Sequence, residues 1–219
     1  MEFLDRAEAG RRLARALEGL RDCRNLLVLA LPRGGVPVGY EIAQALHAPL
    51  DLIVVRKLGV PGQEELAMGA VASGGGRVLN EDVLATLGPN ALALVDRVCA
   101  REEQEVLRRE QLYRGSRPFP ELAGRIVLLV DDGLATGATM RAAARAVRKR
   151  APARLIIAVP VAAESTCREM RAEADEVVCI ANPDPFFGVG QFYGDFRQTT
   201  DDEVRALLSR AAIQKGNEI

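Results

Sequence analysis

The sequence predicts an α/β fold in which a mostly parallel, doubly wound sheet is flanked by helices. The first observation is a set of short apolar runs without polar alternation, which is typical of strands buried on both faces. The second is that helical segments separate these runs, as parallel strands with crossover connections require. We expect the strands at residues 26–30, 51–55, 126–130, 154–159 and 176–180.

The composition indicates one cytoplasmic domain. The chain has 219 residues, of which 48% are hydrophobic, so it suits a single domain over residues 1–219. Its net charge of -1 provides no bulk attraction to nucleic acid or membranes. The four cysteines are widely spaced and His47 is the only histidine, so a disulfide framework, a catalytic triad and a histidine-based metal site are not expected. The N-terminus resembles no signal peptide, and no apolar run reaches membrane-spanning length.

The segment 125–150 contains the most informative pattern. The apolar run 126–130 is followed by Asp131 and Asp132, a loop of small residues at 133–138, and a helical segment at 139–150. A strand, a glycine-bearing turn and a helix N-terminus together expose backbone N–H groups to a phosphate. Paired carboxylates beside such a cradle accept hydrogen bonds from vicinal hydroxyls, so the pattern suits a ribose 5-phosphate. The alternative is that the two acids only cap the turn. The segment lacks the P-loop pattern.

A second turn follows the first expected strand. Arg33, Gly34 and Gly35 precede a helix expected at 36–46. The two glycines permit close approach by a ligand, and the guanidinium of Arg33 is suited to phosphate oxygens. The alternative is an ordinary strand-to-helix turn.

A third turn, at residues 56–65, is expected to be irregular because it contains Gly59, Pro61 and Gly62. Its candidate functional residue is Lys57; the alternative is an exposed basic turn. Residues 68–73 and 77–80 are expected to form a hairpin around three glycines.

Two further segments lie outside the alternating pattern. The charged residues of 91–113 predict a long, exposed helix. We expect this helix to form an insertion at about 90–114. Residues 182–196 are rich in proline, glycine and aromatic residues and predict a small C-terminal hood at about 181–197. Its rings either stack on a flat ligand or form the hood's own core. Thr200–Glu203 predicts a capping box at the start of a final helix, with fraying over residues 214–219.

Residues 130–139, Val-Asp-Asp-Gly-Leu-Ala-Thr-Gly-Ala-Thr, resemble the phosphoribosyl pyrophosphate (PRPP) signature of type I phosphoribosyltransferases. The resemblance extends from Leu31 to about Phe196. It implies a phosphoribosyltransferase with Mg²⁺ as cofactor, a role in nucleotide salvage and a homodimer. It further implies that Asp131, Asp132, Lys57 and Arg33 are catalytic, and that residues 57–66 form a mobile catalytic loop. The residues implied to bind PRPP are Arg33, Gly34, Gly35, Lys57, Asp131, Asp132, Ala135, Thr136, Gly137, Ala138 and Thr139; those for the base are Phe186, Phe187 and Tyr193.

The resemblance is most specific to a bacterial group of unassigned base specificity. Enzymes for 6-oxopurines usually carry an Asp where this chain has Ala135, so a hypoxanthine or guanine substrate is not expected. The alternative function is a PRPP-sensing regulator with the same fold and little or no catalysis. A PRPP synthetase is disfavoured because the sequence shows no ATP site.

Overall fold

The computed structural model describes residues 3–88 and 90–216, and it confirms the predicted fold class. The central sheet has five parallel strands in the order β2-β1-β6-β7-β8. Four of the five expected strands are found within two residues of their expected ends. The bounds are Leu26–Ala30 (β1), Leu50–Leu52 (β2), Ile126–Val130 (β6), Arg154–Val161 (β7) and Glu176–Ala181 (β8).

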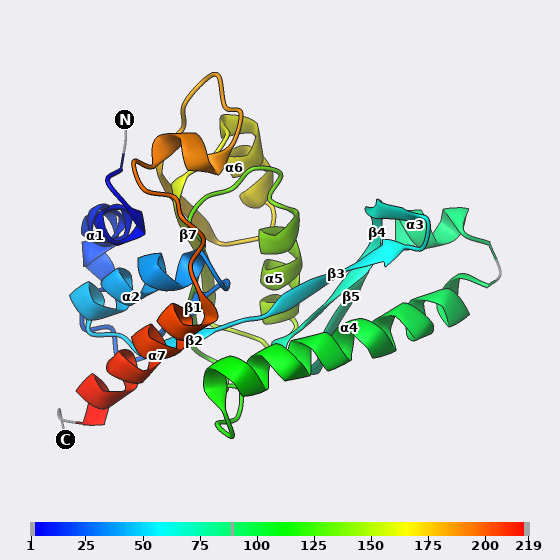
Figure 1. Cartoon of the computed structure of the whole chain (residues 1–219), viewed down its shortest axis with the longest axis horizontal. Helices are drawn as coiled ribbons and strands as arrows, with labels where there is room; N and C mark the ends of the chain where they lie inside the picture. The colour runs from blue at the N-terminus through cyan, green and yellow to red at the C-terminus, as the bar shows by residue number, and fades with distance from the viewer. Residues whose placement is uncertain (1–2, 89, 217–219) are drawn as a thin grey trace.

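Helices cover both faces of this sheet (Figure 1). Consecutive side chains of a strand point to opposite faces, so Val28 and Ala30 join one hydrophobic cluster while Leu27 and Leu29 join another. The first cluster contains side chains of α1, α2 and α7, and the second contains those of α5 and α6. The bounds are Arg6–Ala16 (α1), Gly35–Leu46 (α2), Ala138–Arg148 (α5), Glu164–Met170 (α6) and Asp201–Gly216 (α7), with short 3₁₀ helices at Glu18–Leu20, Ser73–Gly75 and Val189–Phe192.

The sheet has its topological switch point between β1 and β6. These strands pair in register, from Leu26 opposite Ile126 to Ala30 opposite Val130. After β1 the chain crosses to β2, whereas after β6 it crosses to β7 on the other side. The loop after β1 and the loop after β6 therefore begin at the same level, on either side of the crevice where ligands of such folds bind.

A second unit, which we call the arm, extends away from the central sheet (Figure 1). Its antiparallel sheet contacts α5 on one side and α4 on the other. The expected hairpin around residues 74–76 is confirmed as β4 and β5. The arm consists of β3 (Val55–Val60), β4 (Gln63–Ala72), β5 (Gly76–Leu79), α3 (Glu81–Thr86) and α4 (Ala91–Arg114).

Two predictions for the arm are wrong. The expected strand 51–55 is divided, because β2 ends at Leu52 and Val55 begins β3 of the other sheet. The expected irregular loop at 56–65 is largely two paired strands. Gly59 lies at a register shift between these strands, and a Cβ there would lie 2.7 Å from the carbonyl oxygen of Glu64. The glycine therefore marks a β-bulge and close backbone approach within the strand.

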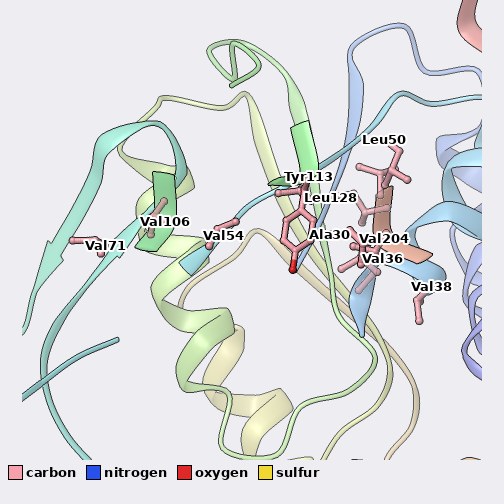
Figure 2. Close-up of a cluster of buried hydrophobic side chains, with 14 of the residues drawn as sticks. Ala30, Val36, Val38, Leu50, Val54, Val71, Val106, Tyr113, Leu128 and Val204 are labelled. Atoms are coloured by element: carbon pink, nitrogen blue, oxygen red, sulfur yellow. The ribbon is translucent and has the colours of Figure 1, made fainter. Parts of the chain in front are cut away.

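The long helix is confirmed, but its expected full exposure is wrong. One face of α4 is buried through Val95, Val98, Cys99 and Val106, which pack into the first cluster. Figure 2 shows members of that cluster from both units, including Val106 of α4. The arm and the central domain thus share a hydrophobic core.

The final helix, α7, begins with the predicted capping box. The capping box is confirmed, because the Thr200 N–H donates to Glu203 Oε2 at 2.7 Å and the Glu203 N–H donates to Thr200 Oγ1 at 3.2 Å. Helix α7 continues to Gly216, and the fraying expected for residues 217–219 lies outside the described residues. Among the described helices, none combines the length and apolar character needed to cross a membrane.

Candidate active site

The loop after β6 is held against its neighbours on both sides. The Asp132 N–H donates to Asp131 Oδ1 at 2.8 Å. The Leu134 N–H donates to the Val161 carbonyl at 2.9 Å, and Thr166 Oγ1 donates to the Ala135 carbonyl at 2.7 Å. Strand β7 and helix α6 therefore fix the path of the loop from the two acids to α5.

The end of this loop has the features of a phosphate cradle. Gly137 has φ 69°, which favours glycine, and directs the chain into the first turn of α5. The N–H groups of a first helical turn have no acceptor within the helix and carry its positive dipole end. Thr136 and Thr139 are exposed there, and the hydrogen bond from the Ala138 N–H to Thr136 Oγ1 is long, at 3.4 Å. An anion can replace this contact at little cost.

The Arg-Gly-Gly turn after β1 packs directly on the two acids. The Leu31 N–H donates to the Val130 carbonyl at 2.8 Å, which joins the ends of β1 and β6. A Cβ on Gly34 would lie 2.0 Å from Asp132 Oδ2, and one on Gly35 would lie 2.6 Å from the Val130 carbonyl oxygen. The two sequence motifs therefore form one site, and both glycines are needed for their contact.

Arg33 points toward the start of α7 rather than the two acids. Its Nη1 lies 3.6 Å from Asp201 Oδ1, and its side chain is 31% exposed. The Tyr113 hydroxyl also donates to Asp201 Oδ1, at 2.6 Å. Burial and this hydrogen bond raise the pKa of Tyr113 to about 12, so the phenol stays protonated at neutral pH. The contact of Arg33 with pyrophosphate stays a prediction.

Lys57 lies on the arm and faces a cavity beside helix α5. It is an exposed residue of β3 and lines a cavity of about 150 Å³ between the arm and α5. Ala138 and Thr139 line the same cavity. Lys57 is thus close to the proposed phosphate cradle, and its place on a strand corrects the expected loop. The mobility of residues 57–66 stays a prediction.

The electrostatics of the acid pair involve a residue that sequence reasoning missed. Burial raises the pKa of Asp131 and of Asp132, and for Asp131 the neighbouring charge of Asp132 raises it further. Arg6 opposes this effect, because its Nε donates to Asp132 Oδ2 at 2.8 Å. These residues are 126 positions apart. No sequence pattern links them, since their contact depends on how the N-terminal segment packs.

The comparisons with known proteins agree with this geometry. The sequence profile of the phosphoribosyl transferase domain matches residues 2–196. This chain belongs to the phosphoribosyl transferase family. The sequence-based recognition is therefore confirmed.

Two Mycobacterium tuberculosis proteins, from strains CDC 1551 and H37Rv, are 48% identical over 209 residues, and their names assign them provisionally to the phosphoribosyl transferases. The match covers 95% of this chain and 47% of each relative, so the chain spans about half the length of these curated relatives. The crystal structure of TT1426 from Thermus thermophilus is similar over 96% of this chain and 99% of that chain, with a TM-score of 0.83 and 42% identity.

The hood of this phosphoribosyl transferase domain uses most of its aromatic rings as core. Tyr193 is 7% exposed and packs on Phe3, with the ring centroids 5.4 Å apart. Its hydroxyl donates to the Asp132 carbonyl at 2.6 Å, and burial raises its pKa. The Tyr193 ring is therefore part of the hood's own core, the second of the two alternatives for these rings, and its contact with a base stays a prediction. Phe186 stacks on Phe192, whereas Phe187 is 84% exposed. Base contacts by Phe186 and Phe187 stay predictions.

Proposed function

We propose that this protein transfers a 5-phosphoribosyl group from PRPP to a nitrogen of a nucleobase-like acceptor and releases pyrophosphate, with Mg²⁺ as cofactor. One observation carries the proposal: the loop after β6 holds the two acids, which pack on the Arg-Gly-Gly turn at the switch point, and it leads directly into the N-terminus of α5. This arrangement supports binding of a sugar that bears vicinal hydroxyls and a terminal phosphate.

The phosphate of the sugar binds at the first turn of α5. The N–H groups of residues 135–139 and the hydroxyls of Thr136 and Thr139 are the donors. The ribose hydroxyls donate to Asp131 and Asp132. These contacts fix the position of C1′ relative to the acceptor, and such positioning is a large part of catalysis for transfer between two bound substrates.

The residues of the site fit a Mg²⁺ ion that the substrate brings. Mg²⁺ commonly binds through one or two carboxylates together with substrate phosphates and water. Here the oxygens of PRPP and water would hold most of the ion's coordination, next to the negative charge of the acid pair. When bound, the ion neutralises negative charge on the pyrophosphate leaving group.

Transfer proceeds as the bond between C1′ and pyrophosphate breaks and the acceptor nitrogen bonds to C1′. Positive charge develops on the ribose, and the nearby carboxylates stabilise it. Arg33 and Lys57 stabilise the departing pyrophosphate; for Arg33 this requires release from Asp201. Closure of residues 57–66 excludes water, which otherwise attacks C1′.

The acceptor is a flat nitrogen heterocycle held beneath the hood, next to Phe186 and Phe187. Ala135 stands where 6-oxopurine enzymes usually carry an Asp, so the proposal favours other bases. A homodimer, a cytoplasmic location and a role in nucleotide salvage are parts of the same proposal.

The test is a pyrophosphate-release screen with PRPP and Mg²⁺ across purines, pyrimidines and other nitrogen heterocycles. We expect release with at least one acceptor, and we expect replacement of both Asp131 and Asp132 by alanine to abolish it. The control is Arg12→Gln on α1, which removes an arginine that pairs with Glu8 and should retain turnover. Tight PRPP binding without release for any acceptor would instead indicate the PRPP-sensing regulator.

A further inference from the structure

Arg6 is held in one position beside the acid pair by three contacts. Its Nε donates to Asp132 Oδ2 at 2.8 Å, and its Nη1 donates to the Arg197 carbonyl at 2.8 Å. Its guanidinium carbon lies 4.1 Å from the centroid of the Phe196 ring. The side chains of Arg6 and Asp132 are 12% and 15% exposed. Such a side chain has lost most of its rotamer freedom before any ligand binds.

The N-terminal segment brings Arg6 to this position. The Phe3 N–H donates to the Phe192 carbonyl at 2.8 Å, and the Gly194 N–H donates to the Phe3 carbonyl at 2.7 Å. Asp5 then caps α1 by accepting the Glu8 N–H at 2.7 Å. Arg6 is the first residue of α1, so pairing with the hood and the helix cap together determine where it lies.

The surroundings of Asp132 explain why a cation is needed there. The groups that face it are Asp131 on the same loop, Arg6 on α1 and the phenol of Tyr193 in the hood; Glu8 of α1 lies near that phenol. Asp131 is the acid beside this carboxylate, whereas the Tyr193 phenol stays protonated because burial raises its pKa. Arg6 is the cation that contacts the carboxylate, and a charge-assisted hydrogen bond both orients a carboxylate and favours its ionised form.

We propose that Arg6 is a positioning residue that orients the Asp132 carboxylate toward the hydroxyls of the ribose. The proposal rests on the proposed function, because it assumes that Asp132 binds the ribose. Arg6 fixes Oδ2, so the carboxylate presents its other oxygen to the ligand without a further entropic cost of ordering. The N-terminal segment is thereby part of the active site, although no motif of the PRPP loop includes it.

The test compares four proteins: wild type, Arg6→Gln, Arg6→Lys and the control Arg12→Gln. Arg12 lies on the same helix and pairs with Glu8, and its guanidinium carbon is 5.4 Å from the centroid of the Phe3 ring. It therefore makes the same types of contact as Arg6 without touching Asp132. The dissociation constant for PRPP with Mg²⁺ is measured by calorimetry from mildly acidic to mildly alkaline pH. Ribose 5-phosphate serves as a second probe, because it lacks the pyrophosphate.

We expect Arg6→Gln to weaken binding of both probes by about 10- to 100-fold, as for a lost hydrogen bond to a charged group. As the pH is lowered, the affinity of Arg6→Gln for PRPP should begin to fall at a higher pH than that of wild type. The reason is that Asp132 becomes protonated more readily without the neighbouring guanidinium. Arg6→Lys should restore the pH at which affinity falls but not the full affinity, since one ammonium cannot reproduce both guanidinium contacts. Arg12→Gln should match wild type in both measurements.

Wild-type affinity and an unchanged pH dependence in Arg6→Gln would overturn the inference while leaving the proposed function intact. If Arg6→Gln does not fold, Arg6→Lys decides, because wild-type affinity in that variant contradicts a positioning role. Failure of wild type itself to bind either probe refutes the proposed function instead.

Discussion

Replacement of Gly34 by alanine tests the contact between the two loops of the site. A Cβ at this position would lie 2.0 Å from Asp132 Oδ2 and 2.6 Å from its Cγ. Contacts below 3.0 Å are not tolerated, so the carboxylate has to move by about 1 Å. The clash falls on a side chain rather than on backbone, so we expect function to suffer more than stability.

The magnitude follows from the contacts of that carboxylate. A displacement of about 1 Å breaks the 2.8 Å hydrogen bond from Arg6 and misplaces the acceptor for the ribose. A hydrogen bond to a charged group contributes about 1.5–3 kcal/mol, so affinity for PRPP should fall about 10- to 150-fold. Gly35→Ala should behave differently, because its Cβ would lie 2.6 Å from the backbone oxygen of Val130. Overpacking against backbone should lower the free energy of unfolding by about 1–3 kcal/mol.

The assay combines calorimetric titration of PRPP with Mg²⁺ and denaturant unfolding of the same variants. Gly19→Ala is the matched control, since nothing lies within 4 Å of a Cβ there. We expect it to keep wild-type affinity and stability. The reasoning is refuted if Gly34→Ala binds PRPP as tightly as wild type, or if it loses as much stability as Gly35→Ala.

The remaining predictions concern charge and stability. The folded-state pKa of Asp131 is raised by burial, so its ionisation opposes folding as pH rises from the unfolded pKa of about 3.9. Asp131→Asn should therefore raise the melting temperature at neutral pH, and this gain should vanish on acidification. The same variant should bind PRPP more weakly. A melting temperature below that of wild type at neutral pH would contradict the prediction. Thr200→Ala should lower the free energy of unfolding by about 0.5–2 kcal/mol, because it removes the capping box with Glu203, and thermal unfolding should detect the loss. Arg114 is 2% exposed in its side chain and pairs with Asp51 at 3.0 Å. Arg114→Met leaves the partly buried carboxylates of Asp51 and Glu110 without this partner and should cost about 3–5 kcal/mol in denaturant unfolding. A loss below about 1 kcal/mol would show these ion pairs to be dispensable.

The sequence predicts the central sheet well because its strands are buried on both faces. The ends of β1 and β6 coincide with the apolar runs 26–30 and 126–130. Asp131 follows the second run directly, and Leu31 and Pro32 lead from the first run into the Arg-Gly-Gly turn. The acid pair and the Arg-Gly-Gly turn were both recognisable, because each follows such a strand directly. Their contact follows from the pairing of β1 with β6, which the structure shows.

The arm could not be predicted in the same way. Residues 52–55 form one continuous apolar run, yet β2 of the central sheet ends at Leu52 and β3 of the other sheet begins at Val55. Hydrophobicity alone does not distinguish such a passage from a strand. Gly59 predicted a loop, whereas its neighbours pair in a bulged strand. Arg6 could not be found because its role depends on tertiary pairing between the chain's beginning and the hood.

The most direct test of the central claim is a crystal structure of the protein with ribose 5-phosphate. We predict that the phosphate binds at the N–H groups of residues 135–139 and that the ribose hydroxyls contact Asp131 and Asp132. A sugar phosphate bound elsewhere, or bound with its phosphate at the acids' end of the loop, would contradict the account.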